Sequence, residues 1–230
     1  MDLTKNIVYQ ANRDIHNLGL AFETFGNVSG RNGNHCLIKP SGVGISRLSE
    51  NNIVKVDLRT SLPIGKYNPS SDTPTHIAIY NNYPEIGGIC HVHSKYATAW
   101  AQAGKPIPCL GTTHADYWND QIPITREMTI EEISGKYEQN TGKTIIEKIE
   151  DQGMNPLELP GVLVWKHAPF SWGLTVEDAV KNANILEKIA EMAWLTLTLN
   201  PNAESIPEML RKKHYKRKHG TSSYYGQNNK

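Results

Sequence analysis

The sequence has few cysteines and lacks a long apolar run. Its 230 residues include only Cys36, Cys90 and Cys109, an odd number without C-x-x-C spacing. This pattern excludes a disulfide framework and a cysteine-type zinc site, so we expect three buried thiols. No stretch approaches the roughly 18 uninterrupted apolar residues that a membrane-spanning helix needs. The polar N-terminal segment resembles neither a signal peptide nor a transit peptide, and we therefore expect a cytoplasmic protein without a membrane partner.

The sequence also lacks a large net charge, because 24 Lys and Arg residues nearly balance 23 Asp and Glu residues. The exception is the basic run RKKHYKRKHG, Arg211 to Gly220. Such a run can contact the phosphates of a nucleic acid, but a solvated helix face is the more common explanation, and we favour it. The length and the 38% content of hydrophobic residues fit a single globular domain over residues 1–230.

Helical periodicity and capping residues predict the main helices. We expect the following: a first helix that ends near Gly19, a second that begins near Ser71 or Asp72, a third capped by Ser94, a fourth with a capping box of Thr129 and Glu132, a fifth over 141–151, and a long one from Thr175 to about Leu199.

Short apolar runs between these helices predict strands at 36–38, 53–58, 86–93 and 161–166, whereas GNVSGRNGN is turn-rich and indicates a loop. Several links between strands are too short for the crossover that a parallel pair requires. The sequence therefore predicts an α/β fold of the α-β-α layered type, in which helices cover a central, largely antiparallel or mixed sheet.

Three histidines and one aspartate form a candidate metal site. His91 and His93 lie two residues apart in an apolar strand, so both imidazoles project from the same face. His167 follows the other buried strand, and Asp72 lies at the start of a helix. Three imidazoles with a carboxylate or an open position are typical of catalytic zinc sites. Taken singly, each histidine is better explained by an ordinary core position, and Asp72 by a plain helix cap.

Three loops offer small residues and backbone donors that suit an anion such as a phosphate. They contain Gly26 and Asn27, Ser41 and Gly42, and Ser70 and Ser71. Glycine permits close backbone approach, serine hydroxyls donate hydrogen bonds, and the helix after Ser71 adds a favourable dipole. Lys39 adds a positive charge. Any one of these loops alone is better explained as a surface turn, but Ser71 adjoins the candidate ligand Asp72, as a sugar phosphate requires.

Taken together, the motifs of the chain resemble one family along nearly its whole length. They are TFGNVSG, IKPSGV, PSSDTPTH, GGICHVHS, AQAGKPIP, GTTHADY, PGVLVWKHAPFSWG and HYKRKHG…YYGQ. In this order they resemble the L-ribulose-5-phosphate 4-epimerases of the class II aldolase family. Because the resemblance extends to the distal tail, it is far more specific than any single motif.

The resemblance implies one zinc or other divalent ion per subunit, held by His91, His93 and His167 with Asp72 at the metal. The three loops and Lys39 would bind a sugar phosphate. It further implies a cyclic homotetramer with active sites between subunits, in which the segment 206–230 contributes to a neighbouring site. Asp116 and Tyr225 would then be acid/base groups from the neighbour. Three more positions match family active-site positions: Thr112, Glu138 and His214.

The reaction implied by the resemblance interconverts L-ribulose 5-phosphate and D-xylulose 5-phosphate. The hydrogen at C4 is not acidic, so inversion requires metal-assisted retro-aldol cleavage of the C3–C4 bond and re-addition to the other face of the aldehyde. The same reaction serves arabinose, ascorbate and other pentose pathways, and the sequence does not choose among them.

Two alternatives remain open at this point. A fuculose-phosphate type of aldolase would use the same metal, but those aldolases carry a glutamate at the position of Asp72. An adducin-like module would reuse the fold without catalysis, and there we would expect the histidines to be lost.

Overall fold

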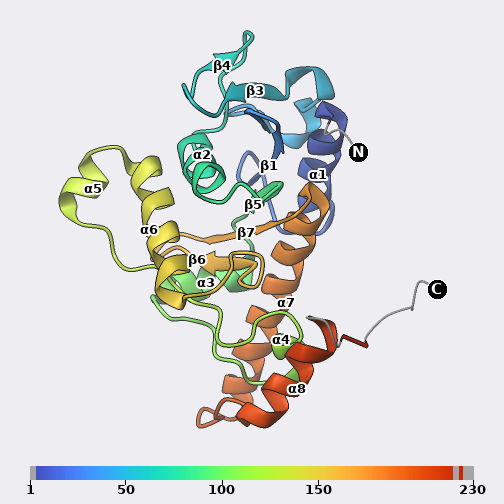
Figure 1. Cartoon of the computed structure of the whole chain (residues 1–230), viewed down its shortest axis with the longest axis vertical. Helices are drawn as coiled ribbons and strands as arrows, with labels where there is room; N and C mark the ends of the chain where they lie inside the picture. Colours follow the sequence, from blue (N-terminus) through green and yellow to red (C-terminus); the bar gives the residue numbers. More distant parts are fainter. Residues whose placement is uncertain (1–3, 220–222, 225–230) are drawn as a thin grey trace.

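A seven-stranded sheet forms the centre of the computed structural model, which describes residues 4–219 and 223–224 (Figure 1). The strand order is β4-β3-β2-β1-β5-β7-β6, and each neighbouring pair is antiparallel. The bounds are β1 Asn27–Asn32, β2 His35–Ile38, β3 Val54–Asp57, β4 Pro63–Ile64, β5 Gly88–His91, β6 Gly161–Leu163 and β7 Pro169–Gly173. The expected antiparallel sheet is confirmed.

Eight α-helices accompany the sheet in the described residues. They are α1 Lys5–Asn17, α2 Thr73–Asn82, α3 Lys95–Ala103, α4 Thr112–Ala115, α5 Ile130–Ser134, α6 Tyr137–Gln152, α7 Val176–Leu199 and α8 Glu208–Lys218. The predicted helices correspond to α1, α2, α3, α5, α6 and α7. None of the helices described is both long and apolar enough to cross a membrane.

Two hydrophobic cores, one on each face of the sheet, confirm the layered arrangement. Side chains alternate along each strand: in β2, Leu37 packs with α1 and the first half of α7, whereas Cys36 and Ile38 pack with α2, α3 and α6 on the other face. All three cysteines are free and buried, as expected. The sheet thus lies between two helical layers.

The sequence interpretation was wrong for β1. Residues 27–32 were expected in a loop because of their glycines and polar side chains, yet β1 lies between β2 and β5. Its Ser29 is fully buried, but the hydroxyl is bonded to His76 and Tyr80. A buried polar strand of this kind lacks the apolar alternation that sequence patterns detect.

Two predicted side-chain caps are also absent, although both residues occupy the N-cap position. Thr175 and the Thr129–Glu132 capping box form their expected bonds. Asp72 and Ser94, in contrast, make no side-chain cap bond to α2 and α3. The carboxylate of Asp72 is therefore available for another role.

Adjacent glycines allow α7 to pack directly on the backbone of β5. A Cβ placed on Gly88 would lie 2.5 Å from the carbonyl oxygen of Thr175 and from the Cα of Val176. Because no real side chain tolerates such contacts, the sequence GG before ICHVH is explained by close packing. This packing joins the strand that carries His91 to the longest helix of the chain.

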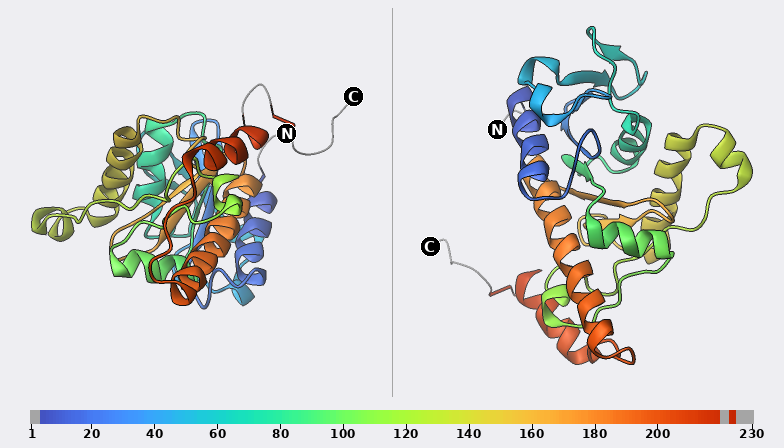
Figure 2. Two further views of the ribbon diagram at one scale, coloured as in Figure 1. Left: turned by 90° about the horizontal axis from the view of Figure 1, so that it is seen from below. Right: turned by 180° about the vertical axis from the view of Figure 1, so that it is seen from behind.

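Residues 211–218 of the basic run lie in α8, which is beside α4 at one end of the molecule (Figure 2). The expectation of a helix is confirmed, but the expectation of a fully solvated face is wrong for part of it. His214, Arg217 and Lys218 contact the carboxylate of Asp116, at the C-terminal end of α4.

Candidate metal centre and substrate pocket

His91 is the last residue of strand β5, and residues of β7 hold its ring in place. Its ring is 1% exposed and stacks on Phe170 of β7, with 4.1 Å between ring centroids. The Nδ1 atom lies 3.0 Å from the carbonyl oxygen of Pro169. A carbonyl can only accept a hydrogen bond, so Nδ1 carries the proton, and in the neutral ring Nε2 carries the lone pair.

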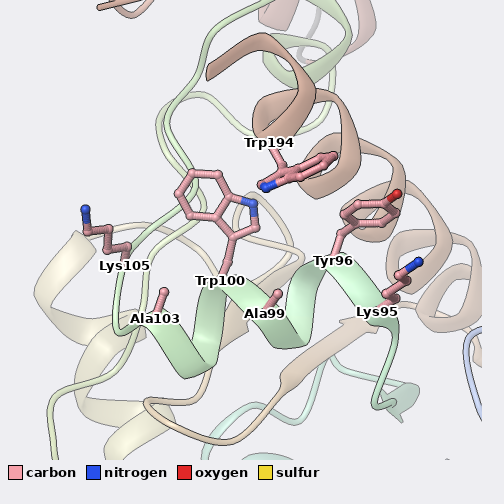
Figure 3. A pocket seen from close by; sticks show the side chains of 7 residues that line it. All are labelled: Lys95, Tyr96, Ala99, Trp100, Ala103, Lys105 and Trp194. Carbon is pink, nitrogen blue, oxygen red and sulfur yellow. The ribbon is translucent and has the colours of Figure 1, made fainter. Parts of the chain in front are cut away.

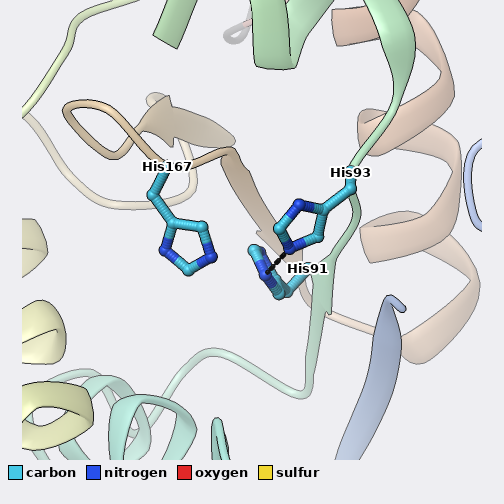
Figure 4. A group of neighbouring side chains, drawn as sticks. All are labelled: His91, His93 and His167. Atoms are coloured by element: carbon cyan, nitrogen blue, oxygen red, sulfur yellow. Dashed lines mark hydrogen bonds between the residues drawn. The ribbon is translucent and has the colours of Figure 1, made fainter. Parts of the chain in front are cut away.

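His93 and His167 bring their rings to the same point as His91 (Figure 4). His93 follows β5, and its Nε2 lies 3.1 Å from Nε2 of His91. His167 lies in the turn between β6 and β7, directly after Lys166, which has a positive φ of 57°. One ring nitrogen from each histidine lies within 4.8 Å of the others. The structure therefore brings together the three histidines predicted from the sequence.

The surroundings favour the neutral form of each ring. Burial lowers the pKa of His91 well below its ordinary value, and the neighbouring imidazoles lower it further. Burial also lowers the pKa of His93 and of His167, while the charge of Asp72 acts in the opposite direction. Neutral imidazoles have the lone pairs that a metal ion requires.

Asp72 supplies a carboxylate beside this cluster. Its Oδ2 accepts a hydrogen bond of 2.7 Å from the side-chain amide of Asn27 and lies 4.0 Å from Nε2 of His91. Asn27 is directly opposite His91 in the pairing of β1 with β5. Three imidazoles that converge beside one oriented carboxylate fit a divalent metal of the zinc type, with nitrogen and oxygen ligands.

The three histidines line a pocket of about 470 Å³. The pocket is lined by most of the residues predicted to bind metal or substrate: Gly26, Asn27, Lys39, Ser41, Gly42, Ser70, Ser71, Asp72, His91, His93, Glu138 and His167. Three separate parts of the chain, all expected to contact one sugar phosphate, therefore share a single cavity.

The two serine loops are joined by backbone hydrogen bonds. Ser41 N–H donates to the carbonyl of Asn68, and Ser70 N–H donates to the carbonyl of Lys39, at 3.0 and 2.9 Å. Ser71 is exposed and lies two residues before α2, so its side chain is near the positive end of the helix dipole. Lys39 is buried, and its ammonium group donates to the carbonyl of Thr24.

Sequence reasoning missed four residues of the pocket wall: Thr24, Phe25, Pro40 and Tyr137. The rings of Phe25 and Tyr137 lie 5.2 Å from His93 and 6.5 Å from His167, between centroids. Phe25 and Pro40 directly adjoin predicted residues, Thr24 precedes Phe25, and Tyr137 precedes Glu138. Their closeness in sequence to predicted site residues was the signal that could have identified them.

Thr112 begins α4, Asp116 directly follows it, and His214 lies in α8; none of the three lines this pocket. Arg217 donates two hydrogen bonds of 2.8 and 2.5 Å to Asp116, and His214 donates one of 3.1 Å. Burial would raise the pKa of Asp116, but these bonds and the charge of Lys218 outweigh it and lower the pKa. Tyr225 lies outside the described residues.

Comparison with known proteins identifies the family. The model of the class II aldolase and adducin N-terminal domain matches residues 6–194. The chain belongs to this family. A protein of Salmonella paratyphi A named L-ribulose-5-phosphate 4-epimerase UlaF is 48% identical over 229 residues, which cover 99% of this chain and 100% of that protein. A Salmonella typhi protein of the same name matches equally.

Solved structures of this family share the fold. An L-fuculose 1-phosphate aldolase superposes with a TM-score of 0.77 at 19% identity, over 93% of this chain and 95% of its own. A second such aldolase, from Glaciozyma antarctica PI12, has a TM-score of 0.74 at 19% identity and covers 93% of this chain and 80% of its own. At this identity the likeness establishes the class II aldolase fold and no more.

The histidine cluster predicts that His93→Asn removes the metal. The substitution deletes one of three converging nitrogen ligands, and we expect affinity to fall by roughly tenfold or more, as even outer-shell changes cost that much. The measurement is metal content per chain after dialysis. His35→Asn, on β2, is the control and should keep its metal. A full equivalent of tightly bound ion in His93→Asn would contradict the proposed site.

Proposed function

We propose that this protein is an L-ribulose-5-phosphate 4-epimerase, which interconverts L-ribulose 5-phosphate and D-xylulose 5-phosphate. The observation that carries the proposal is the 48% identity to enzymes of this name over essentially the entire length of both chains. The pocket supports it, because anion-binding loops and a metal-type histidine cluster line the same cavity. A sugar phosphate has the two kinds of groups that such a cavity would bind.

The phosphate would bind to the loops around Ser41, Ser70 and Ser71. Their hydroxyl and backbone N–H groups and the N-terminal end of α2 attract an anion, and Lys39 adds its charge. The opposite end of the substrate would then reach the histidines that line the same pocket. A fragment held by its phosphate after C3–C4 cleavage stays bound while its aldehyde group rotates, which is the requirement for inversion at C4.

His91, His93 and His167, with Asp72, would hold the divalent ion, for which zinc fits the ligand set. Such an ion would act as a Lewis acid that stabilises negative charge on sugar oxygens during cleavage of a carbon–carbon bond. The protein residues orient the substrate and exclude water: the ring of Tyr137 and the exposed Phe25 flank the histidines at the pocket wall.

Asp116 and Tyr225 would move the protons. In the isolated chain, Asp116 directly follows α4, and its bonds to Arg217 and His214 lower its pKa and keep it ionised, which is the form that a general base must have. It does not line the pocket of its own chain. We therefore infer a cyclic homotetramer in which Thr112, Asp116, His214 and the segment 206–230 of one subunit complete the pocket of the next.

The fuculose-phosphate type of aldolase is the second candidate, because its members share the fold. Asp72 favours the epimerase. It is bonded to Asn27 and lies at the histidine cluster, where a short carboxylate stays beside the metal rather than reaching toward substrate as a base. The adducin-like alternative is less favoured because the three histidines are present and converge. A cytoplasmic location, in a pentose pathway, belongs to the same proposal.

The proposal predicts the products of a direct assay. Purified protein incubated with L-ribulose 5-phosphate should form D-xylulose 5-phosphate, detected with a coupled enzyme, without accumulation of glycolaldehyde phosphate. Removal of divalent metal by a chelator should abolish the reaction, and its return should restore it. Accumulation of the two cleavage fragments would instead identify an aldolase. If neither D-xylulose 5-phosphate nor the cleavage fragments form although a full equivalent of metal is bound, the proposed epimerase activity is refuted.

Asp116→Asn should keep bound metal and assembly but lose epimerase activity by about 10²- to 10⁴-fold, since an amide cannot accept the proton. Asp120→Asn, at an exposed position four residues later, is the matched control and should retain activity. Steady-state kinetics, metal content and native mass are measured on the same samples. A loss below about tenfold would assign Asp116 a structural role.

Mixing two inactive chains tests whether the C-terminal segment acts in trans. A chain truncated after Gly220 lacks Tyr225, and His93→Asn lacks the metal, so each should be inactive alone. Hybrid tetramers combine an intact metal site from one parent with an intact tail from the other, and part of the activity should return. Subunit exchange confirmed by native mass without any recovered turnover would refute the role of Tyr225 between subunits.

A further inference from the structure

The N-terminus of α3, directly after His93, is capped by a carboxylate from α7. Glu187 accepts hydrogen bonds from the backbone N–H groups of Tyr96 and Ala97, one on each carboxylate oxygen, both at 2.9 Å. Ser94 occupies the N-cap position but makes no cap bond, and its hydroxyl is buried without a partner among the described residues. A side chain distant in sequence therefore replaces the expected local cap.

Two effects stabilise the contact between Glu187 and the start of α3. The first N–H groups of a helix have no partner within the helix, and leaving them buried without acceptors is costly. A carboxylate satisfies two of them at once and also places an acceptor with negative charge at the positive end of the helix dipole. Glu187 is only 8% exposed, so water does not readily replace it.

Helix α3 supports two of the three histidines. Its first residue, Lys95, follows His93 by two positions. At the other end of α3, Lys166 donates two hydrogen bonds: its backbone N–H donates to the carbonyl of Ala101, and its ammonium group donates to the carbonyl of Gln102. Lys166 has the strained positive φ of the turn that presents His167. A shift of α3 would therefore move both rings.

His91 does not depend on α3 in this way, because the strand pairing and the carbonyl of Pro169 hold it. Within the described residues, the ring of His93 is hydrogen-bonded only to His91. Its position is consequently set by the backbone between the end of β5 and the start of α3. The two hydrogen bonds that Tyr96 and Ala97 donate to Glu187 anchor that backbone at the start of α3.

We propose that Glu187 is a positioning residue of the metal site: by anchoring the start of α3 it holds His93 and His167 at their distances from His91 and so sets the metal affinity. The inference rests on the metal site of the proposed function. Glu187 itself neither lines the pocket nor belongs to the histidine cluster.

Other contacts between α3 and α7 provide a control. The indole N–H of Trp100 donates to the carbonyl of Ala190 at 3.1 Å, and Tyr96 lies 5.8 Å from Trp194 between ring centroids. These rings surround a surface pocket between the two helices (Figure 3). Trp100→Phe removes a hydrogen bond between the same helices without changing the cap of α3.

The test is the dissociation constant for Zn²⁺, measured by competition with a chromophoric chelator. Glu187→Gln keeps the size of the side chain but turns an amide NH₂ toward a backbone N–H. We expect binding to weaken by about 10- to 100-fold, as for other outer-shell changes. Two control variants, Trp100→Phe and Glu191→Gln, should bind Zn²⁺ like the wild type. The second removes another carboxylate of α7, one that pairs with Lys188. The absorption spectrum of bound Co²⁺ should change only in Glu187→Gln.

The outcomes distinguish a positioning role of Glu187 from a merely structural role and from the absence of the proposed metal site. If Glu187→Gln lowers the melting temperature of the metal-free protein but leaves the dissociation constant and the Co²⁺ spectrum unchanged, Glu187 is merely structural and the inference is overturned. If that variant does not fold, Glu187→Asp, which keeps the charge on a shorter side chain, is measured instead, and wild-type affinity there overturns the inference. A wild-type chain without tight Zn²⁺ binding refutes the proposed site itself.

Discussion

The register of β5 between β1 and β7 is the constraint on which the site depends. It pairs His91 with Asn27 on one side and with Phe170 on the other. Asn27 in turn orients the carboxylate of Asp72, and the residue before Phe170 accepts the Nδ1 proton of His91. Because side chains alternate between the faces of a sheet, a slip of one residue would turn His91 to the opposite face. His91, its orienting partner and the nearby carboxylate are thus fixed together by backbone pairing.

The same rigid frame is compatible with more than one reaction. Aldolases at 19% identity share it over most of this chain, so the fold does not decide between cleavage and epimerisation. The distinguishing features lie in side chains and in the distal part of the chain. Asp72 stays at the histidines, while Asp116 is bound to α8 and does not line the pocket of its own chain. The proposed proton-transfer group Asp116 thus lies away from the pocket of its own chain, as the proposed assembly requires.

Much of this arrangement was predictable from the sequence, and the failures share a physical cause. The helices were recognisable by periodicity and by local caps such as Thr175, and the spacing of His91 and His93 indicated a shared face. Strand β1 was missed because its buried Ser29 is satisfied by side chains distant in sequence. Ser94 was expected to cap α3, whereas the acceptor is Glu187. Local patterns predict local hydrogen bonds, and these failures occur where the partner comes from another part of the fold.

The most direct test of the central claim is an anomalous diffraction map of the zinc-loaded protein, recorded at the zinc edge. We expect one strong peak per chain, surrounded by ring nitrogens of His91, His93 and His167, with the carboxylate of Asp72 beside it. A chain that binds a full equivalent of zinc at any other position, with the three imidazoles bonded only to one another and to protein, would contradict it.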